Sequence, residues 1–218
     1  MTGYVAAMTR DWVAWHREYA DPDSGLSRRL EWIRGAMRAV FDEAPPGPIT
    51  VLSLCSGEAR DVSGAATGHS RAGDIVGAAV ELSGGLASIA ADNLRAAGTA
   101  MEVRCVDAGR SMYWDDLLPV DLLVLAGIFG NLSDDHIRRT IAAVPAMVRP
   151  GGTIIWTRHR HEPDATPMIR DAFAAVGCEE VSFVSDGPDT FSVGVARRAG
   201  TEQAALPGLL FRFLEDAW

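Results

Sequence analysis

The stretch from Ile49 to Asp61 constrains the fold of this chain more than any other. It opens with an apolar, partly β-branched run over 49–54 that predicts a short buried strand. Small residues then break the pattern at Cys55, Ser56 and Gly57, and a helix pattern follows. A strand, a tight turn and a helix N-terminus expose backbone N–H groups to a ligand, although many α/β proteins use such a turn for packing alone. The stretch therefore predicts an α/β fold with a candidate binding site at this turn.

Strand and helix patterns continue to alternate as far as residue 177. Helix caps are predicted at Ser83 and Ser133, each followed by apolar residues with helical spacing. The sequence predicts a Rossmann-like, doubly wound and mostly parallel sheet of seven strands, with an antiparallel strand from a C-terminal hairpin. Residues 206–214 fit either an extra edge strand or a docked tail. The strands after the first are expected over 76–82, 101–106, 121–126, 153–157, 181–184 and 191–196.

Two helices are predicted ahead of this sheet. The first places four aromatic or ionisable side chains on one face, namely Trp12, Trp15, His16 and Tyr19. This face fits either a helix packed on the core or a lid over a pocket. The second helix has an apolar stripe, and a proline-rich linker then leads into the sheet. We therefore expect one domain over 1–218, with a helical covering segment over 1–44 and a cofactor-binding core over 49–198.

The charge and the cysteine pattern narrow the classes of function. A net charge of −9 and a pI near 5.0 disfavour nucleic acid as a partner, because its phosphates need a positive surface. No apolar run is long enough to span a membrane, and the N-terminus lacks a signal-peptide pattern, so a cytoplasmic protein is expected. The three cysteines have neither disulfide nor metal spacing. The expected partner is a small-molecule substrate, and a homodimer is compatible with the sequence.

Polar or glycine-containing segments stand at the predicted ends of the next three strands. Glu81 lies 24 positions after Gly57, near the spacing at which a carboxylate accepts both hydroxyls of a ribose in nucleotide-binding folds. Asp107 could accept from the exocyclic amine of a base, whereas the alternative is an ordinary turn aspartate. The fourth strand runs into Gly127-Ile128-Phe129-Gly130-Asn131. Because ligands bind beyond the carboxyl ends of parallel strands, these segments predict one shared site.

With these segments in this order, residues 49 to about 196 resemble the class I S-adenosylmethionine-dependent methyltransferases. Arg149-Pro150-Gly151-Gly152 is similar to the family's turn before its fifth strand, and the N-terminal helices resemble its substrate-covering segment. The family's first strand carries a carboxylate and then three alternating glycines, where this chain has Ser53, Cys55, Gly57 and Ala59. The runs Leu-Ser-Leu-Cys, Gly-Ile-Phe-Gly-Asn and Trp-Thr-Arg-His look like those of a small actinobacterial subgroup.

The resemblance implies that S-adenosyl-L-methionine is the cofactor. Glu81 would hold its ribose with Leu82 beside the adenine, and Asp107 and Ala108 would bind the adenine edge. Arg60 either pairs with the cofactor's carboxylate or forms a surface ion pair. The segments after the first and fourth strands would line the methionine part and the sulfonium, and they comprise Cys55, Ser56, Gly57, Gly127, Phe129 and Asn131.

A dehydrogenase is the natural competing interpretation, because it also begins with a glycine turn and has an acidic residue after its second strand. Its dinucleotide carries a pyrophosphate, which would meet the anionic side chain of Glu58 beside the turn. A cationic sulfonium meets no such repulsion. The charge at this turn therefore favours the methyltransferase.

Candidate catalytic residues follow the fifth strand. Methyl transfer depends mainly on alignment and exclusion of water, and it needs a base only where the acceptor loses a proton. His159 is the candidate base or acceptor-orienting residue, Arg158 could bind an acidic group of the substrate, and His16 and Tyr19 could line the acceptor site. The predicted reaction is methyl transfer to oxygen or nitrogen of a small molecule. The alternatives are a cyclisation that uses the same cofactor without methyl transfer and a catalytically silent binding subunit.

Overall fold

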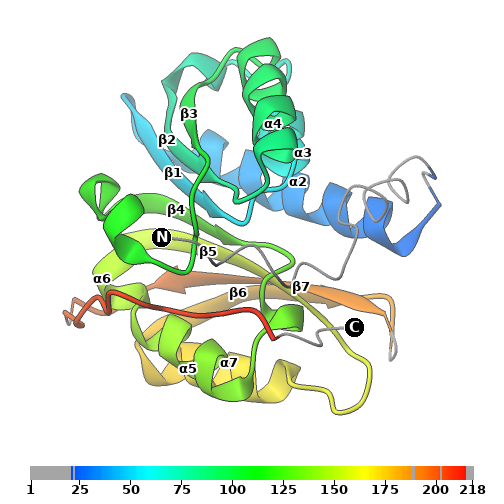
Figure 1. Ribbon diagram of the computed structural model, residues 1–218, viewed down its shortest axis with the longest axis vertical. Helices are drawn as coiled ribbons and strands as arrows, with labels where there is room; N and C mark the ends of the chain where they lie inside the picture. Colours follow the sequence, from blue (N-terminus) through cyan, green and yellow to red (C-terminus); the bar gives the residue numbers. More distant parts are fainter. Residues whose placement is uncertain (1–20, 22, 188–189, 202, 215–218) are drawn as a thin grey trace, which may run out of the picture.

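A single seven-stranded sheet runs through the protein in the order β3-β2-β1-β4-β5-β7-β6 (Figure 1). The computed structural model describes residues 21, 23–187, 190–201 and 203–214. Strand β7 is antiparallel to its neighbours β5 and β6, and the other strands are parallel. The predicted Rossmann-like fold is confirmed. The strands are β1 (Ile49–Leu54), β2 (Ile75–Val80), β3 (Ala100–Arg104), β4 (Val120–Leu125), β5 (Val148–His159), β6 (Cys178–Ser185) and β7 (Phe191–Arg198).

Helices cover both faces of the sheet (Figure 1). Successive strand residues point to opposite faces, so Val51 and Ile155 pack on the side of α2 and α3, whereas Leu52 and Ile154 pack on the side of α5 and α7. Each central strand is therefore buried on both faces, as in other doubly wound folds. The α-helices are α2 (Gly25–Glu43), α3 (Arg60–Ala66), α4 (Gly84–Ala96), α5 (Asp134–Ala142), α6 (Val144–Met147) and α7 (Thr166–Ala175). Short 3₁₀ turns are η2 (Ala72–Asp74), η3 (Ser111–Tyr113), η4 (Asp115–Leu117) and η5 (Phe129–Asn131).

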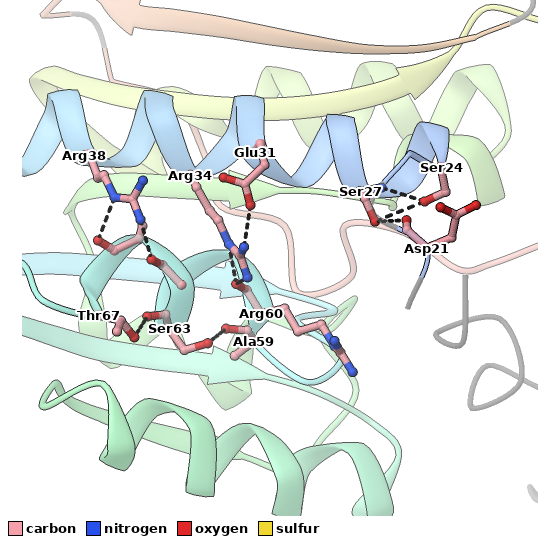
Figure 2. A network of polar contacts seen from close by, with 12 residues as sticks. Asp21, Ser24, Ser27, Glu31, Arg34, Arg38, Ala59, Arg60, Ser63 and Thr67 are labelled. Carbon is pink, nitrogen blue, oxygen red and sulfur yellow. Dashed lines mark hydrogen bonds and ion pairs between the residues drawn. The ribbon is translucent and has the colours of Figure 1, made fainter. Parts of the chain in front are cut away.

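Helix α2 is bound to α3 by two arginine side chains (Figure 2). Arg34 donates to the Arg60 carbonyl at 2.8 and 3.1 Å, and Arg38 donates to the Gly64 carbonyl at 2.8 Å. Carbonyls in the last turn of a helix have no partner within the helix, so Arg38 satisfies a group that would otherwise need water. Beside these arginines, α2 buries an apolar stripe made of Leu26, Leu30, Ile33, Met37 and Phe41.

This packing makes α2 part of the core. It is the described portion of the predicted covering segment over 1–44, and its buried stripe reaches β7 and β5. The first predicted helix, with His16 and Tyr19, lies outside the described residues. A lid formed by that helix stays a prediction.

Two local predictions about helix caps have different outcomes. Ser133 caps α5 as predicted, and its hydroxyl accepts from the His136 N–H at 3.4 Å. Ser83 occupies the N-cap position of α4, but its side chain makes no capping bond. The carboxylate of Glu81 instead accepts from the Ser83 N–H at 2.8 Å. A negative charge at a helix N-terminus is favourable, so Glu81 supplies the stabilisation that was expected from the serine.

The C-terminal residues 206–214 are a docked tail. They form neither helix nor strand, and Leu210 and Phe211 are buried in the same core cluster as α5 and α7. The red segment in Figure 1 crosses the molecule on that side of the sheet. The tail ends near the carboxyl ends of the strands, because the Leu214 N–H donates to the Asn131 carbonyl at 2.9 Å.

Replacing Gly35 with alanine is expected to stabilise the protein by about 1 kcal/mol, because glycine loses more backbone entropy than alanine when a helix forms. Gly35 is exposed within α2, and a β-carbon there would have no atom within 4 Å. Urea unfolding measures the change. Gly64→Ala is the matched control, since its β-carbon would displace the Arg34 guanidinium and cancel the gain. A Gly35→Ala protein no more stable than wild type would contradict this account of α2.

Candidate functional site

The turn after β1 has left-handed backbone at three positions, only one of which is a glycine. Cys55, Gly57 and Ala59 have φ values of 51°, 57° and 52°, so all three adopt the left-handed conformation. The resemblance set these positions against the family's three alternating glycines. A side chain in this region costs roughly 1–2 kcal/mol per residue, so the fold maintains strain at Cys55 and Ala59. Such strain is typical of backbone that must approach a ligand.

Glu81 joins this turn to the following helix. The residue is only 8% exposed. Its Oε2 accepts from the Gly57 N–H and its Oε1 from the Ser83 N–H, both at 2.8 Å. Each carboxylate oxygen has a second lone pair, so Glu81 can still accept from a ligand hydroxyl. The ends of β1 and β2 are therefore joined through the predicted ribose-binding residue.

The loop after β3 adds a second carboxylate. Asp107 accepts from the Gly109 N–H at 2.9 Å and lies 3.4 Å from Arg110 Nε. The buried Ala108 has its carbonyl bound by the Trp114 indole N–H at 3.0 Å, whereas Leu82 is 57% exposed. These contacts hold the backbone of the loop. The Leu82 side chain, at the end of β2, is accessible to a ligand.

The Cys55 thiol lies close enough to the ends of β2 and β3 to be affected by the charges of their carboxylates. Burial raises its pKa well above the usual value, and the charges of Glu81 and Asp107 raise it further. Carboxylates after β2 and β3 therefore act on one side chain after β1. The thiol stays neutral at physiological pH, so Cys55 has no thiolate character.

The loop after β4 is held by two neighbouring side chains. The Gly127 N–H donates to Thr157 Oγ1 at 2.8 Å, and the Gly127 carbonyl accepts from Asn131 Nδ2 at 2.8 Å. The Phe129 ring does not face this site, because it is fully buried against Trp156 and Phe173. The Phe129 side chain therefore belongs to the core, and the predicted place of this residue beside the cofactor stays a prediction.

Arg158 and His159 end β5 beside this loop. Arg158 donates to the Phe129 carbonyl at 2.9 Å, and burial lowers its pKa. The His159 imidazole is 9% exposed, and burial, Arg158 and His161 lower its pKa to about 4. It is therefore neutral at pH 7 and a weaker base than an exposed histidine. This electrostatic setting favours the orienting role over the base role.

Arg60 forms an ion pair with Glu58. This contact matches the surface-pair alternative, because Arg60 is 41% exposed while the Glu58 side chain is largely buried. The pair partly offsets the negative charge that argued against a pyrophosphate. The charge argument against a dinucleotide is correspondingly weaker than the sequence indicates.

Three buried polar atoms at this end of the sheet lack a hydrogen-bond partner within the described part of the chain. They are Ser56 Oγ after β1, Asn131 Oδ1 after β4 and Arg158 Nε in β5. Each buried unpaired polar group costs about 1–3 kcal/mol. Their presence on three neighbouring strands indicates a site that a polar ligand completes. The residues present are therefore compatible with a polar cofactor such as S-adenosylmethionine and with a polar acceptor bound beside it.

Sequence reasoning missed two buried charged residues near the turn. Asp61 lies in the first turn of α3, where burial raises its pKa while Arg29 and Arg34 lower it. Arg29 is 4% exposed, and its guanidinium lies 4.9 Å from the centre of the Phe191 ring. Arg29 falls on the apolar stripe of α2 between Leu26 and Ile33. In the sequence, a charged residue within the apolar stripe of this helix could have identified Arg29 as buried.

Other parts of the described chain add little to the site. A small pocket lies between α7 and β6, lined in part by Arg170 and Cys178, away from the strand ends. Among the described residues, no group of three or more His, Cys, Asp and Glu side chains has the arrangement of a metal site. None of the described helices has the length and apolar character that crossing a membrane requires.

The fold is shared with solved methyltransferase structures. Magnesium protoporphyrin IX methyltransferase from Synechocystis PCC 6803, solved with bound SAM, aligns with a TM-score of 0.63 and 14% identity over 87% of this chain and 92% of its own. The CurJ carbon methyltransferase has the same TM-score and 13% identity, over 87% of this chain and 59% of its own. The [4+2]-cyclase SpnF has a TM-score of 0.60 and 15% identity, over 82% and 84%. No protein-family model and no curated protein matches the sequence. This protein therefore has a Rossmann-like methyltransferase fold.

Acidification is expected to destabilise the protein partly through His159. Its folded pKa of about 4 lies below the ordinary 6.5, so the unfolded chain binds more protons between these values. The contribution to stability is full above about pH 6.5 and is lost as the pH falls toward 4. Between pH 7.5 and 5.5 the loss should be about 1 kcal/mol.

Urea unfolding of wild type and His159→Asn at these two pH values measures the effect of His159. The asparagine variant should lose less stability on acidification, because it has no group that titrates in this window. Equal losses in both proteins would show that other groups dominate.

Proposed function

We propose that this protein transfers a methyl group from S-adenosyl-L-methionine to an oxygen or nitrogen atom of a small-molecule acceptor in the cytoplasm. The observation that carries the proposal is the buried Glu81 carboxylate at the end of β2, bound to the turn at Gly57 with lone pairs to spare. A carboxylate so placed suits a ribose diol. The fold shared with a methyltransferase that was solved with bound SAM supports the same cofactor.

The residues that would hold the cofactor come from three strand ends. Glu81 would accept the ribose hydroxyls, Asp107 would accept from the adenine amine, and the left-handed turn at 55–59 would admit the methionine part. When bound, the sulfonium supplies an electrophilic methyl carbon and a neutral leaving group.

Methyl transfer requires the residues of the chain mainly to align the acceptor and to exclude water. In such a transfer, the acceptor's lone pair would form the bond to the methyl carbon while the carbon–sulfur bond breaks and its electrons stay with sulfur. An acceptor hydroxyl also loses its proton, which passes to water or to the neutral imidazole of His159. His159 and the loop after β4 would orient the acceptor and exclude water, and this alignment can supply most of the rate. Three short runs of the sequence look like those of an actinobacterial subgroup of small methyltransferases, and the proposal includes membership of that subgroup.

Calorimetric titration of the purified protein with S-adenosylmethionine, S-adenosylhomocysteine and, separately, NAD tests the cofactor. Binding of the first two without NAD is the expected result. NAD binding alone would establish a dehydrogenase, and silence from all three would favour a binding subunit. Because SpnF is a cyclase with the same fold, product analysis must also show transfer of the methyl group. Turnover without methyl loss from the cofactor would indicate cyclisation.

A further inference from the structure

The C-terminal tail links the two loops that flank the proposed cofactor site. The Leu210 N–H donates to the Gly109 carbonyl at 2.8 Å, beside Asp107 after β3. Four residues later, the Leu214 N–H donates to the Asn131 carbonyl at 2.9 Å, after β4. The segment 209–214 therefore bridges the loop after β3 and the loop after β4, and we call it the strap.

The strap is closely fitted to the loop after β3. A β-carbon on Gly109 would overlap the Phe211 carbonyl oxygen, and the Phe211 side chain is 3% exposed. The Arg212 main chain contacts His136 on α5. The His136 Nδ1 lies 3.2 Å from the Arg212 carbonyl oxygen and 3.4 Å from the Arg212 main-chain nitrogen. The strap thus has a defined path up to Leu214.

The far end of the strap presents apolar side chains beside Asn131. Phe213 is 39% exposed and stacks on Phe211 with ring centres 6.0 Å apart, and Leu214 is 48% exposed. Exposed apolar side chains at a fixed position next to a reaction site form a surface that an apolar substrate can cover.

The side chain of Asn131 indicates independently which kind of ligand binds next to this apolar surface. Its side chain is only 5% exposed, and Nδ2 donates to the Gly127 carbonyl. A carbonyl can only accept, so this bond fixes the orientation of the amide and identifies the other atom as Oδ1. Oδ1 is buried without a donor in the described part of the chain. A buried acceptor with no donor favours a ligand that brings one.

We propose that the strap forms one wall of the acceptor site and that Asn131 Oδ1 receives the hydroxyl or amine donor of an apolar acceptor. The inference rests on the proposed methyl transfer and narrows its substrate class to uncharged, ring-bearing or aliphatic molecules with one such donor. The bond to Asn131 directs the donor atom's remaining lone pair, and the amide removes no proton. Asn131, which the resemblance placed with the cofactor, becomes a residue that positions the acceptor.

Two probes that differ in the donor test this assignment. With S-adenosylhomocysteine saturating, wild type should bind 2-naphthol at least about 10-fold more tightly than 2-methoxynaphthalene, since the ether leaves Oδ1 unpaired. Asn131→Ala should abolish that preference. Asn131→Asp keeps an acceptor oxygen but loses the bond to Gly127, so it should retain the preference. Asn93→Ala is the matched control, because the Asn93 amide also donates to a main-chain carbonyl, that of Glu58.

Strap variants test the wall separately. Leu214→Pro removes the N–H that binds the Asn131 carbonyl, and Phe213→Ser removes exposed ring surface. Both should weaken the two naphthalene probes alike by about 5-fold or more, while S-adenosylhomocysteine affinity and melting temperature stay at the wild-type values. Gly109→Ala should displace the strap and weaken both probes as well, but with a lower melting temperature, because its β-carbon would overlap the Phe211 carbonyl oxygen.

The outcomes separate this inference from the proposed function. If S-adenosylhomocysteine does not bind wild type, both fail. If it binds but naphthol has no advantage over its ether, or if Asn131→Ala keeps that advantage, the role of Asn131 is overturned while the cofactor assignment stands. If the strap variants bind both probes as wild type does, the strap is not a wall of the acceptor site.

Discussion

Replacing Glu81 with alanine is expected to weaken S-adenosylmethionine binding by more than about 10-fold, since hydrogen bonds to a charged group are worth about 1.5–3 kcal/mol each. The variant loses the acceptor for the ribose hydroxyls. It also loses the bonds that hold the Gly57 N–H and the Ser83 N–H, so the turn becomes less preorganised. Calorimetric titration with S-adenosylmethionine gives the dissociation constant.

A second substitution separates these two effects. Glu81→Gln keeps one carbonyl oxygen and the side-chain shape but loses the charge, so its affinity should lie between those of wild type and Glu81→Ala. Glu102→Ala is the matched control, because this β3 carboxylate is exposed and pairs with Arg104. Unchanged affinity in a folded Glu81→Ala protein would remove Glu81 from the ribose site and take away the main support for the proposed cofactor.

The strand ends could be predicted because they depend on local pattern. Short apolar runs interrupted by small or acidic residues mark where a buried strand meets solvent, and this was enough to place Glu81 and Asp107 at one edge of the sheet. Strand bounds were less accurate. β5 runs from 148 to 159 rather than 153 to 157, because it pairs with β7 on one side and with β4 across a bulge on the other. Such pairing is non-local and leaves no mark in the strand's own sequence.

The remaining features of the site depend on contacts between distant segments. The carboxylate of Glu81 caps α4 because the turn after β1 holds it there, whereas the sequence indicated a serine cap. The tail docks through main-chain bonds to Gly109 and Asn131, which carry no side-chain signature. The left-handed conformations at Cys55 and Ala59 also follow from the tertiary structure, since local preference would place glycine there.

Replacing Gly77 with alanine is expected to destabilise the protein by more than about 3 kcal/mol, because overpacking against main chain and a strained φ add together. Gly77 lies in β2 opposite Val51 and has φ of 110°. Its β-carbon would overlap the Val51 carbonyl oxygen, which belongs to the neighbouring central strand and cannot rotate away as a side chain could. Urea unfolding at pH 7.5 measures the loss.

Gly73→Ala is the control for this substitution, because a β-carbon at Gly73 in η2 would meet no atom within 4 Å. It should leave stability within about 0.5 kcal/mol of wild type. The separation of β1 from β2 also sets the bond between Glu81 and Gly57, so any folded fraction of Gly77→Ala should bind S-adenosylmethionine less tightly. Stability equal to that of Gly73→Ala would mean that the β1–β2 register is wrong, and with it the position of Glu81 against the turn.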